Sequence, residues 1–285
     1  MNHRTYERGT GASTQYRTPR SPVERTPPGT TRRDFLRTGI GALAVPMLSS
    51  CLGSPTDIAD SNAATRLSAR PSIPTESPTL GLSELGLGGS RDGIMYVPRN
   101  YSDESAYPLF IGLHGAGGDA DNWNGSYPDR AEANSMIFVA PDSRSSSWDL
   151  MTYPDRTFGP DVQFLDEMLD HVFTHCRIDP NRIALGGFSD GASYSLSLGI
   201  GNGDLFTHLV AYSPGYYVIP DPVVGQPTIF VSHGPHDDVL PFYNTANTIV
   251  PALENAGYDV TFHEFDGGHE VPTEVSTAAL DWFLA

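Results

Sequence analysis

The segment IALGGFSDGASYSLSL at residues 183–198 is the strongest indicator of the fold of this chain. Its apolar start predicts a buried strand, its glycine-rich centre a tight turn, and its end a helix, with Ser189 at the turn. A serine between a strand and a helix is typical of a nucleophilic hydroxyl exposed at the edge of a sheet. Gly187 and Gly191 would let the strand and the helix approach closely. A pentapeptide of this kind is weak support alone, so the interpretation depends on its context.

From about residue 90 onward, short apolar strands alternate with amphipathic segments. Strands are predicted at residues 94–97, 109–113, 136–140, 183–187, 208–212, 228–232 and 260–265, and helices at 161–175, 244–256 and 273–284. Strands that alternate with helices form a mostly parallel sheet with helices on both faces. The sequence therefore predicts an α/β fold, a three-layer sandwich, with its chemistry at the carboxyl ends of the strands.

A glycine-rich loop, HGAGG at residues 114–118, follows the predicted strand 109–113. A turn of this kind presents backbone N–H groups, and the N–H of Ala116 together with that of Asp190 would form an oxyanion hole. A phosphate-binding loop is the competing interpretation. It is disfavoured because no Lys-Ser/Thr pair follows and no dinucleotide-binding fingerprint is present.

The loop HGPHDDVLP at residues 233–241 also follows a predicted strand, and it offers two carboxylates, Asp237 and Asp238. A carboxylate here would orient a histidine ring and stabilise its protonated form, and by chemistry alone either residue qualifies. The cluster of His233, His236 and Asp237 suggests a metal site instead. That alternative is weak, because further ligands would be needed and no second cluster presents itself.

His269, in the glycine turn GGHE at residues 267–270, follows the last predicted strand. A single histidine in a loop is most often a surface residue. Here, however, the order Ser189, then Asp237 or Asp238, then His269 is that of a Ser–Asp–His triad at successive strand ends. The agreement of these placements predicts a nucleophile, an acid and a base in one site, with no metal and no cofactor.

Four segments carry a family resemblance: LHGAGG at 113–118, GFSDG at 187–191, HGPHDDVLP at 233–241 and GHE at 268–270. Residues 90–285 resemble the phospholipase/carboxylesterase branch of the α/β-hydrolases, which includes small bacterial carboxylesterases and acyl-protein thioesterases. The resemblance implies an α/β-hydrolase fold with a small lid or none, Asp237 as the acid, and oxyanion N–H groups from Ala116 and Asp190. One departure is Asp190 itself, where many members carry glutamine.

The substrate pocket is predicted from aromatic residues in loops. The connection 143–159 contains Trp148 and Tyr153, and Tyr216 follows another strand. Apolar groups in such loops form the wall of an acyl or aromatic pocket, or else fill the core of the domain, and the sequence leaves both open. Trp123 is expected to pack in the core.

The N-terminal segment has the pattern of an export signal. TRRDFLR at residues 31–37 indicates the twin-arginine route, and a short apolar stretch, 40–48, follows. LSSC at 48–51 resembles a lipobox, which predicts lipidation of Cys51; an ordinary signal with a chance cysteine is the alternative. We therefore expect an export signal at 1–50, a flexible tether at 51–89, and a lipid anchor at the outer face of a prokaryotic membrane. Without lipidation, a periplasmic or secreted protein would result.

The charge of the chain argues against one class of partner. The net charge is −17, and every basic residue is arginine. Residues 1–50 carry a net charge of +5, so the rest is strongly acidic and lacks the basic surface that nucleic acids need. We expect a serine esterase acting on a small-molecule, lipid or polymer ester. A thioesterase or a polymer or feruloyl-type esterase on the same fold is the alternative, as is a non-catalytic surface lipoprotein that binds a ligand.

Overall fold

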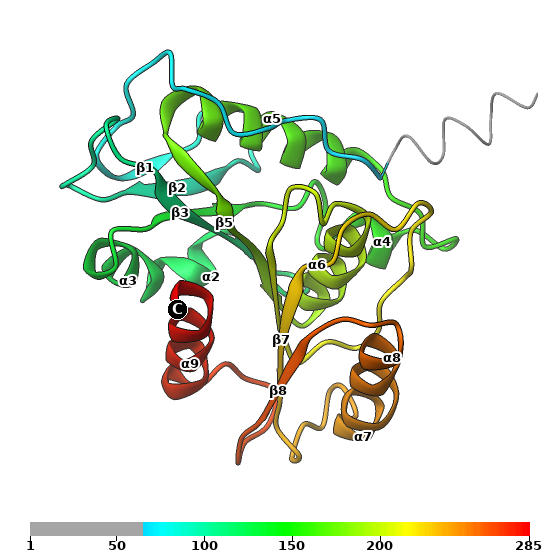
Figure 1. Ribbon diagram of the computed structural model, residues 1–285. Helices are drawn as coiled ribbons and strands as arrows, with labels where there is room; N and C mark the ends of the chain where they lie inside the picture. Colours follow the sequence, from blue (N-terminus) through cyan, green and yellow to red (C-terminus); the bar gives the residue numbers. More distant parts are fainter. Residues whose placement is uncertain (1–64) are drawn as a thin grey trace, which may run out of the picture. The chain divides into compact units, whose positions relative to one another are not determined.

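The computed structural model describes residues 65–285, which are built around one eight-stranded sheet (Figure 1). The strands are β1 (Gly81–Glu84), β2 (Gly93–Val97), β3 (Tyr107–Leu113), β4 (Ile137–Pro141), β5 (Ile178–Phe188), β6 (His208–Tyr212), β7 (Thr228–His233) and β8 (Val260–Glu264). Their order across the sheet is β1-β2-β4-β3-β5-β6-β7-β8. β1 and β2 pair antiparallel and the six others are parallel, so their carboxyl ends meet at one edge.

Helices cover both faces of the sheet. They are α2 (Asp121–Asn124), α3 (Tyr127–Ala133), α4 (Asp149–Thr152), α5 (Pro160–His175), α6 (Asp190–Gly201), α7 (Phe242–Asn244), the π-helix η1 (Thr245–Ile249), α8 (Val250–Asn255) and α9 (Thr273–Leu284). Residues of α5, α6 and α8 pack in one buried cluster and residues of α2, α3 and α9 in the other (Figure 1). The predicted three-layer α/β-hydrolase architecture is confirmed.

The alternation of side chains along β3 shows how the sheet separates the two clusters. Leu109, Ile111 and Leu113 are fully buried on the face covered by α5 and α6. Phe110 points to the other face, where its ring centroid lies 6.0 Å from that of Phe283 in α9. Successive side chains of a strand point to opposite faces, so a continuous apolar run fits a strand covered on both sides.

The predicted strands are all present, whereas the predicted helix 244–256 is divided. It consists of α7, the π-helical turn η1 and α8. Pro251, near the start of α8, has no backbone N–H and so cannot continue an α-helical ladder from the preceding turn. Four elements, β1, α2, α3 and α4, were not predicted.

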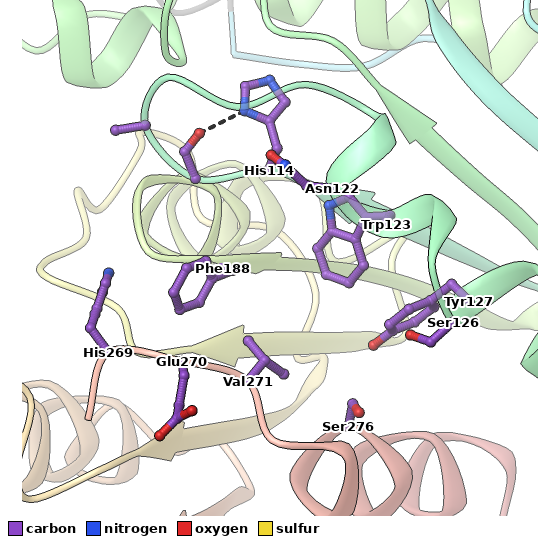
Figure 2. A pocket seen from close by; sticks show the side chains of 12 residues that line it. His114, Asn122, Trp123, Ser126, Tyr127, Phe188, His269, Glu270, Val271 and Ser276 are labelled. Atoms are coloured by element: carbon purple, nitrogen blue, oxygen red, sulfur yellow. Dashed lines mark hydrogen bonds between the residues drawn. The ribbon is translucent and has the colours of Figure 1, made fainter. Parts of the chain in front are cut away.

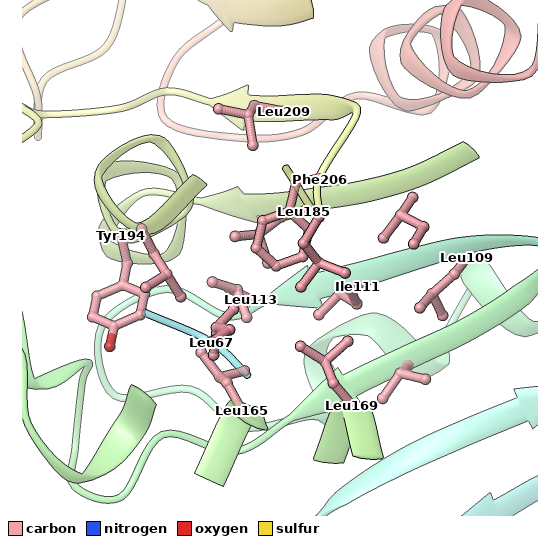
Figure 3. Packing of buried hydrophobic residues seen from close by; sticks show 14 of the residues in the cluster. Leu67, Leu109, Ile111, Leu113, Leu165, Leu169, Leu185, Tyr194, Phe206 and Leu209 are labelled. Carbon is pink, nitrogen blue, oxygen red and sulfur yellow. The ribbon is translucent and has the colours of Figure 1, made fainter. Parts of the chain in front are cut away.

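The segment 65–89 is part of the folded domain, which corrects the predicted tether at 51–89. Leu67 is 2% exposed and lies in the main core cluster (Figure 3). Its N–H donates to Asn202 Oδ1 at 2.9 Å, and Asp166 accepts the N–H groups of Ser68 and Ala69. Residues 81–84 form β1, so the domain includes residues well before 90. The predicted export signal and Cys51 lie outside the described residues.

Candidate active site

The turn between β5 and α6 holds Ser189 in a strained conformation. Its φ is 58° and its ψ is −115°, a region that a residue with a side chain rarely adopts. The glycines have the role expected from the sequence. A Cβ on Gly187 would lie 2.3 Å from the backbone of Gly191, and a Cβ on Gly191 would lie 2.2 Å from the carbonyl oxygen of Leu113. Only glycine at both positions permits the close approach that presents Ser189 at the sheet edge.

Ser189, His269 and Asp237 form a hydrogen-bonded relay. Ser189 Oγ lies 2.9 Å from His269 Nε2, and His269 Nδ1 lies 2.7 Å from Asp237 Oδ2. An ionised carboxylate only accepts hydrogen bonds, so Nδ1 carries the proton and Nε2 is free to accept the hydroxyl proton of Ser189. The three residues named in the sequence are therefore brought together in the geometry of a nucleophile, a base and an orienting acid.

Asp237 is kept ionised by its hydrogen bonds. Oδ1 accepts the N–H of Val239 at 2.9 Å and that of Leu240 at 2.7 Å. Burial acts to raise the pKa of Asp237, but the bonds from Leu240, His269 and Val239 outweigh it, and the pKa is lowered. The other candidate acid, Asp238, is exposed and takes no part in this relay.

The glycine-rich loop after β3 is fixed by its own histidine. The N–H of Ser143 donates to His114 Nε2 at 3.0 Å, so His114 donates from Nδ1 to the carbonyl oxygen of Gly115 at 2.7 Å (Figure 2). Burial lowers the pKa of His114, which keeps the ring neutral in this role. Gly117 has a φ of 71°, which turns the backbone sharply after Ala116.

Two backbone donors at this edge are free to bind an oxyanion. Within residues 65–285, the N–H groups of Ala116 and Asp190 donate no hydrogen bond. That of Asp190 is unused because it lies in the first turn of α6. The side chain of Asp190, where glutamine is common in the resembling family, accepts a hydrogen bond from Ser147 Oγ at 2.6 Å. The carboxylate is thereby tied to the loop after β4.

A cavity of about 410 Å³ opens beside the relay (Figure 2). Its wall includes Ala116 and His269, so it reaches the reacting groups. Aromatic and apolar lining comes from Trp123, Tyr127, Phe188 and Val271, and polar lining from Asn122, Ser126, Glu270 and Ser276. Trp123 thus both packs in the core, as expected, and lines the cavity. The elements that supply this wall, α2, α3 and the start of α9, were not predicted as a pocket.

The three residues predicted for the pocket lie elsewhere. Trp148 is fully buried, and its indole N–H donates to the carbonyl oxygen of His114 at 2.8 Å, so it supports the oxyanion loop from below. Tyr153 is 39% exposed on the surface. Tyr216 is half-buried under the guanidinium of Arg156, 4.1 Å from its ring centroid. The prediction of Trp148 as a pocket wall is wrong, because its ring is enclosed between His114 and Tyr194.

The described residues show no arrangement suited to a metal ion. Residues 65–285 hold no group of three or more His, Cys, Asp or Glu side chains in a ligating arrangement. In the cluster considered from the sequence, His236 is exposed beside Asp266, whereas His233 is buried against Asp237. Within the same part of the chain, no helix has the length and apolar character needed to cross a bilayer.

Comparisons with known proteins agree with this geometry. The chain is 30% identical over 176 residues to a probable feruloyl esterase C of Aspergillus niger, covering 59% of this chain and 62% of that protein. It is 27% identical over 231 residues to feruloyl esterase C of Emericella nidulans, covering 68% and 82%. The chain thus spans just under two thirds of the first of these relatives.

Solved structures show the same fold at low identity. Esterase PE8 superposes with a TM-score of 0.52 at 22% identity, covering 68% of this chain and 98% of that one. An acetyl xylan esterase from Aspergillus awamori superposes with a TM-score of 0.54 at 16% identity, covering 72% and 100%. Residues 100–284 match the phospholipase/carboxylesterase family. The chain therefore belongs to this family of α/β-hydrolases.

Proposed function

We propose that the protein is a serine esterase that hydrolyses carboxylic esters through an acyl-enzyme. The observation that carries the proposal is the relay from Ser189 Oγ through His269 to Asp237, with distances of 2.9 and 2.7 Å. These distances are within the range for direct proton transfer between a nucleophile and its base.

The reaction follows from the donors and acceptors in place. Ser189 Oγ attacks the ester carbonyl carbon while His269 Nε2 takes its proton, and the carbonyl oxygen becomes an alkoxide held by the N–H groups of Ala116 and Asp190. His269 then protonates the leaving alcohol as the C–O bond breaks. Water, deprotonated by His269, attacks the acyl carbon. As the C–O bond to Ser189 breaks, His269 returns the proton to Ser189 Oγ and the carboxylic acid is released.

For the substrate, we propose esters of aromatic acids such as ferulic acid. The cavity beside the relay is lined by Trp123, Tyr127 and Phe188, which suit a flat ring. The two relatives compared above carry the name feruloyl esterase. Aliphatic esters and thioesters are the competing substrates on the same site.

The cellular location that we propose is outside the cytoplasmic membrane, through export by the twin-arginine route and lipidation of Cys51. The support is the segment TRRDFLR at 31–37 and the lipobox-like LSSC at 48–51. Mass analysis of the protein extracted from membranes tests this. A mature chain that begins beyond Cys51, or that carries no lipid, would contradict it.

A substrate panel tests the activity. We expect hydrolysis of methyl ferulate and methyl cinnamate by the native protein, and a rate near background for Ser189→Ala. Equal rates for the two proteins would refute the esterase and favour a ligand-binding protein. A higher kcat/KM for an aliphatic ester or for a thioester would refute the aromatic preference.

A cavity-filling variant tests the assignment of the pocket. Val271→Trp adds a ring at the cavity wall, so we expect it to raise KM for methyl cinnamate more than for methyl acetate. Val223→Trp is the control, because Val223 is 49% exposed and is not part of this wall. An equal rise in KM for both esters would contradict binding of the aromatic group of the substrate in this cavity.

A further inference from the structure

A second histidine is buried against the acid of the relay. His233 Nε2 lies 2.9 Å from Asp237 Oδ2, and both side chains are fully buried. This is the same oxygen that lies 2.7 Å from His269 Nδ1. Asp237 Oδ2 is therefore shared between the imidazole of the base and a second imidazole from the end of β7.

The proton on His233 can be assigned from its neighbours. Nε2 lies within hydrogen-bond distance of two oxygens, Asp237 Oδ2 and the carbonyl oxygen of Leu240 at 3.0 Å. Both oxygens are acceptors, so Nε2 must carry a proton and donate. Burial lowers the pKa of His233, with the opposing contributions of Leu240 and Asp237 smaller, so the ring is neutral.

The other ring nitrogen holds His233 in place. Nδ1 lies 2.8 Å from the hydroxyl of Thr245, which is fully buried in η1 and also lies 3.0 Å from the carbonyl oxygen of Pro214. The single hydroxyl proton of Thr245 lies between two acceptors, Nδ1 of the neutral ring and the carbonyl oxygen of Pro214. The edge of the ring packs against Phe242, with centroids 5.9 Å apart. The imidazole is thus fixed on both sides, with Nε2–H aimed at the carboxylate.

We propose that His233 is a positioning residue that acts through Asp237 and sets the basicity of His269. The inference rests on the proposed esterase function. With the N–H groups of Val239 and Leu240 on Oδ1, His233 fixes the plane of the carboxylate. Its bond to Oδ2 also draws off part of the negative charge that His269 faces. Without it, that charge would favour the protonated form of His269, in which Nε2 cannot accept the proton of Ser189.

The test compares two substitutions at one position. His233→Leu removes the donor, whereas the terminal amide of His233→Gln can place an N–H where Nε2 lies. For His233→Leu we expect kcat to fall about 10- to 100-fold with KM within about twofold, because His233 does not line the cavity. We also expect the ascending limb of the kcat/KM profile to move to higher pH. His233→Gln should return the ascending limb to its wild-type pH and recover most of kcat.

The controls separate this role from simple packing. Ser232→Ala alters the neighbouring buried residue, whose hydroxyl has no partner within residues 65–285, and should leave the profile unchanged. Rates are normalised to active sites titrated with a fluorophosphonate, so loss of folded protein does not count as loss of kcat. If His233→Leu does not fold, Thr245→Val decides the question, because it removes only the hydroxyl that holds Nδ1 and should move the limb in the same direction.

Three results would overturn the proposal. The first is that the wild type is active while His233→Leu keeps kcat within threefold of the wild type and shows no shift in the ascending limb of its kcat/KM profile. Another is a Gln variant no better than the Leu variant, and the third is an unmoved limb in Thr245→Val when the Leu variant does not fold. A wild type without ester hydrolysis would instead refute the proposed function, so the two failures are distinguishable.

Discussion

The buried carboxylate pair Asp149 and Asp161 should make the stability of this protein fall as pH rises from about 4 to 6. The two residues clamp the loop after β4. Asp161 accepts the N–H of Arg144 at 2.5 Å and of Asp149 at 2.6 Å, and Asp149 accepts the N–H of Asp161 at 2.9 Å. Burial and the charge of Asp149 raise the pKa of Asp161 from 3.8 to about 6, against the opposing hydrogen bonds and the charge of Arg144.

The magnitude follows from this shift. Between pH 4 and 6 the folded protein keeps Asp161 protonated while the unfolded chain releases the proton, so the folded state binds more protons there. Stability from this group is therefore complete below pH 4 and is lost as pH rises through 6. A shift of about two pKa units corresponds to at most about 3 kcal/mol.

The assay is urea unfolding of the wild type and of Asp161→Asn at pH 4, 5, 6 and 7. Asparagine does not titrate, so the variant should gain up to about 3 kcal/mol relative to the wild type between pH 4 and 7. Any pH-independent cost of the amide cancels when the change in stability with pH is compared. The titration of groups common to both proteins cancels too, including that of Asp237, whose lowered pKa makes stability rise with pH. A stability difference that stays constant with pH, or that falls, would refute the reasoning.

Three further predictions test other parts of the structure. Leu67→Ala should lower the free energy of unfolding by about 2–5 kcal/mol, because Leu67 is buried in the core, whereas Ile73→Ala, at a side chain 79% exposed, should change it by less than about 0.5 kcal/mol in urea titrations. Trp148→Phe keeps an aromatic six-membered ring but removes the N–H that donates to the carbonyl oxygen of His114, so kcat should fall about tenfold with KM unchanged in initial-rate assays; an unchanged kcat would contradict a role in holding the oxyanion loop. Burial raises the pKa of Cys176 to about 12, so mass analysis after iodoacetamide treatment at pH 8 should find Cys176 labelled only in unfolded protein, and labelling of the native protein would contradict its burial.

The triad could be predicted because each member follows its own strand within a short motif. Parallel strands bring their carboxyl ends to one edge, so Ser189, Asp237 and His269 had to meet once the strands were identified. The choice between Asp237 and Asp238 was different. It depended on which of the two carboxylates points toward His269, and the residue type alone does not distinguish them.

The segment 65–89 could not be predicted as folded because it has no period. Its contacts are made by groups about a hundred or more positions away in the sequence, such as Asp166 for Ser68 and Asn202 for Leu67. The amino-acid composition of such a segment is that of a linker, because the groups that hold it lie elsewhere in the sequence. These hydrogen bonds, the pairing of β1 with β2 and the burial of Leu67 show that it belongs to the domain.

The reversal between Trp123 and Trp148 shows why a pocket is harder to predict than a triad. Aromatic residues in one loop indicate that their side chains are buried. They do not indicate whether those side chains pack in the core or line the substrate cavity. Trp148 turned inward because its indole N–H finds the carbonyl oxygen of His114. The ring of Trp123 lies over Gly112 in β3. A Cβ at Gly112 would come within 2.9 Å of this ring, so the glycine makes room for Trp123 beside the cavity. We therefore expect substrate selectivity to be set from the α2 and α9 side of Ser189, while Ser147 and Trp148 in the loop after β4 hold the two segments that supply the oxyanion N–H groups.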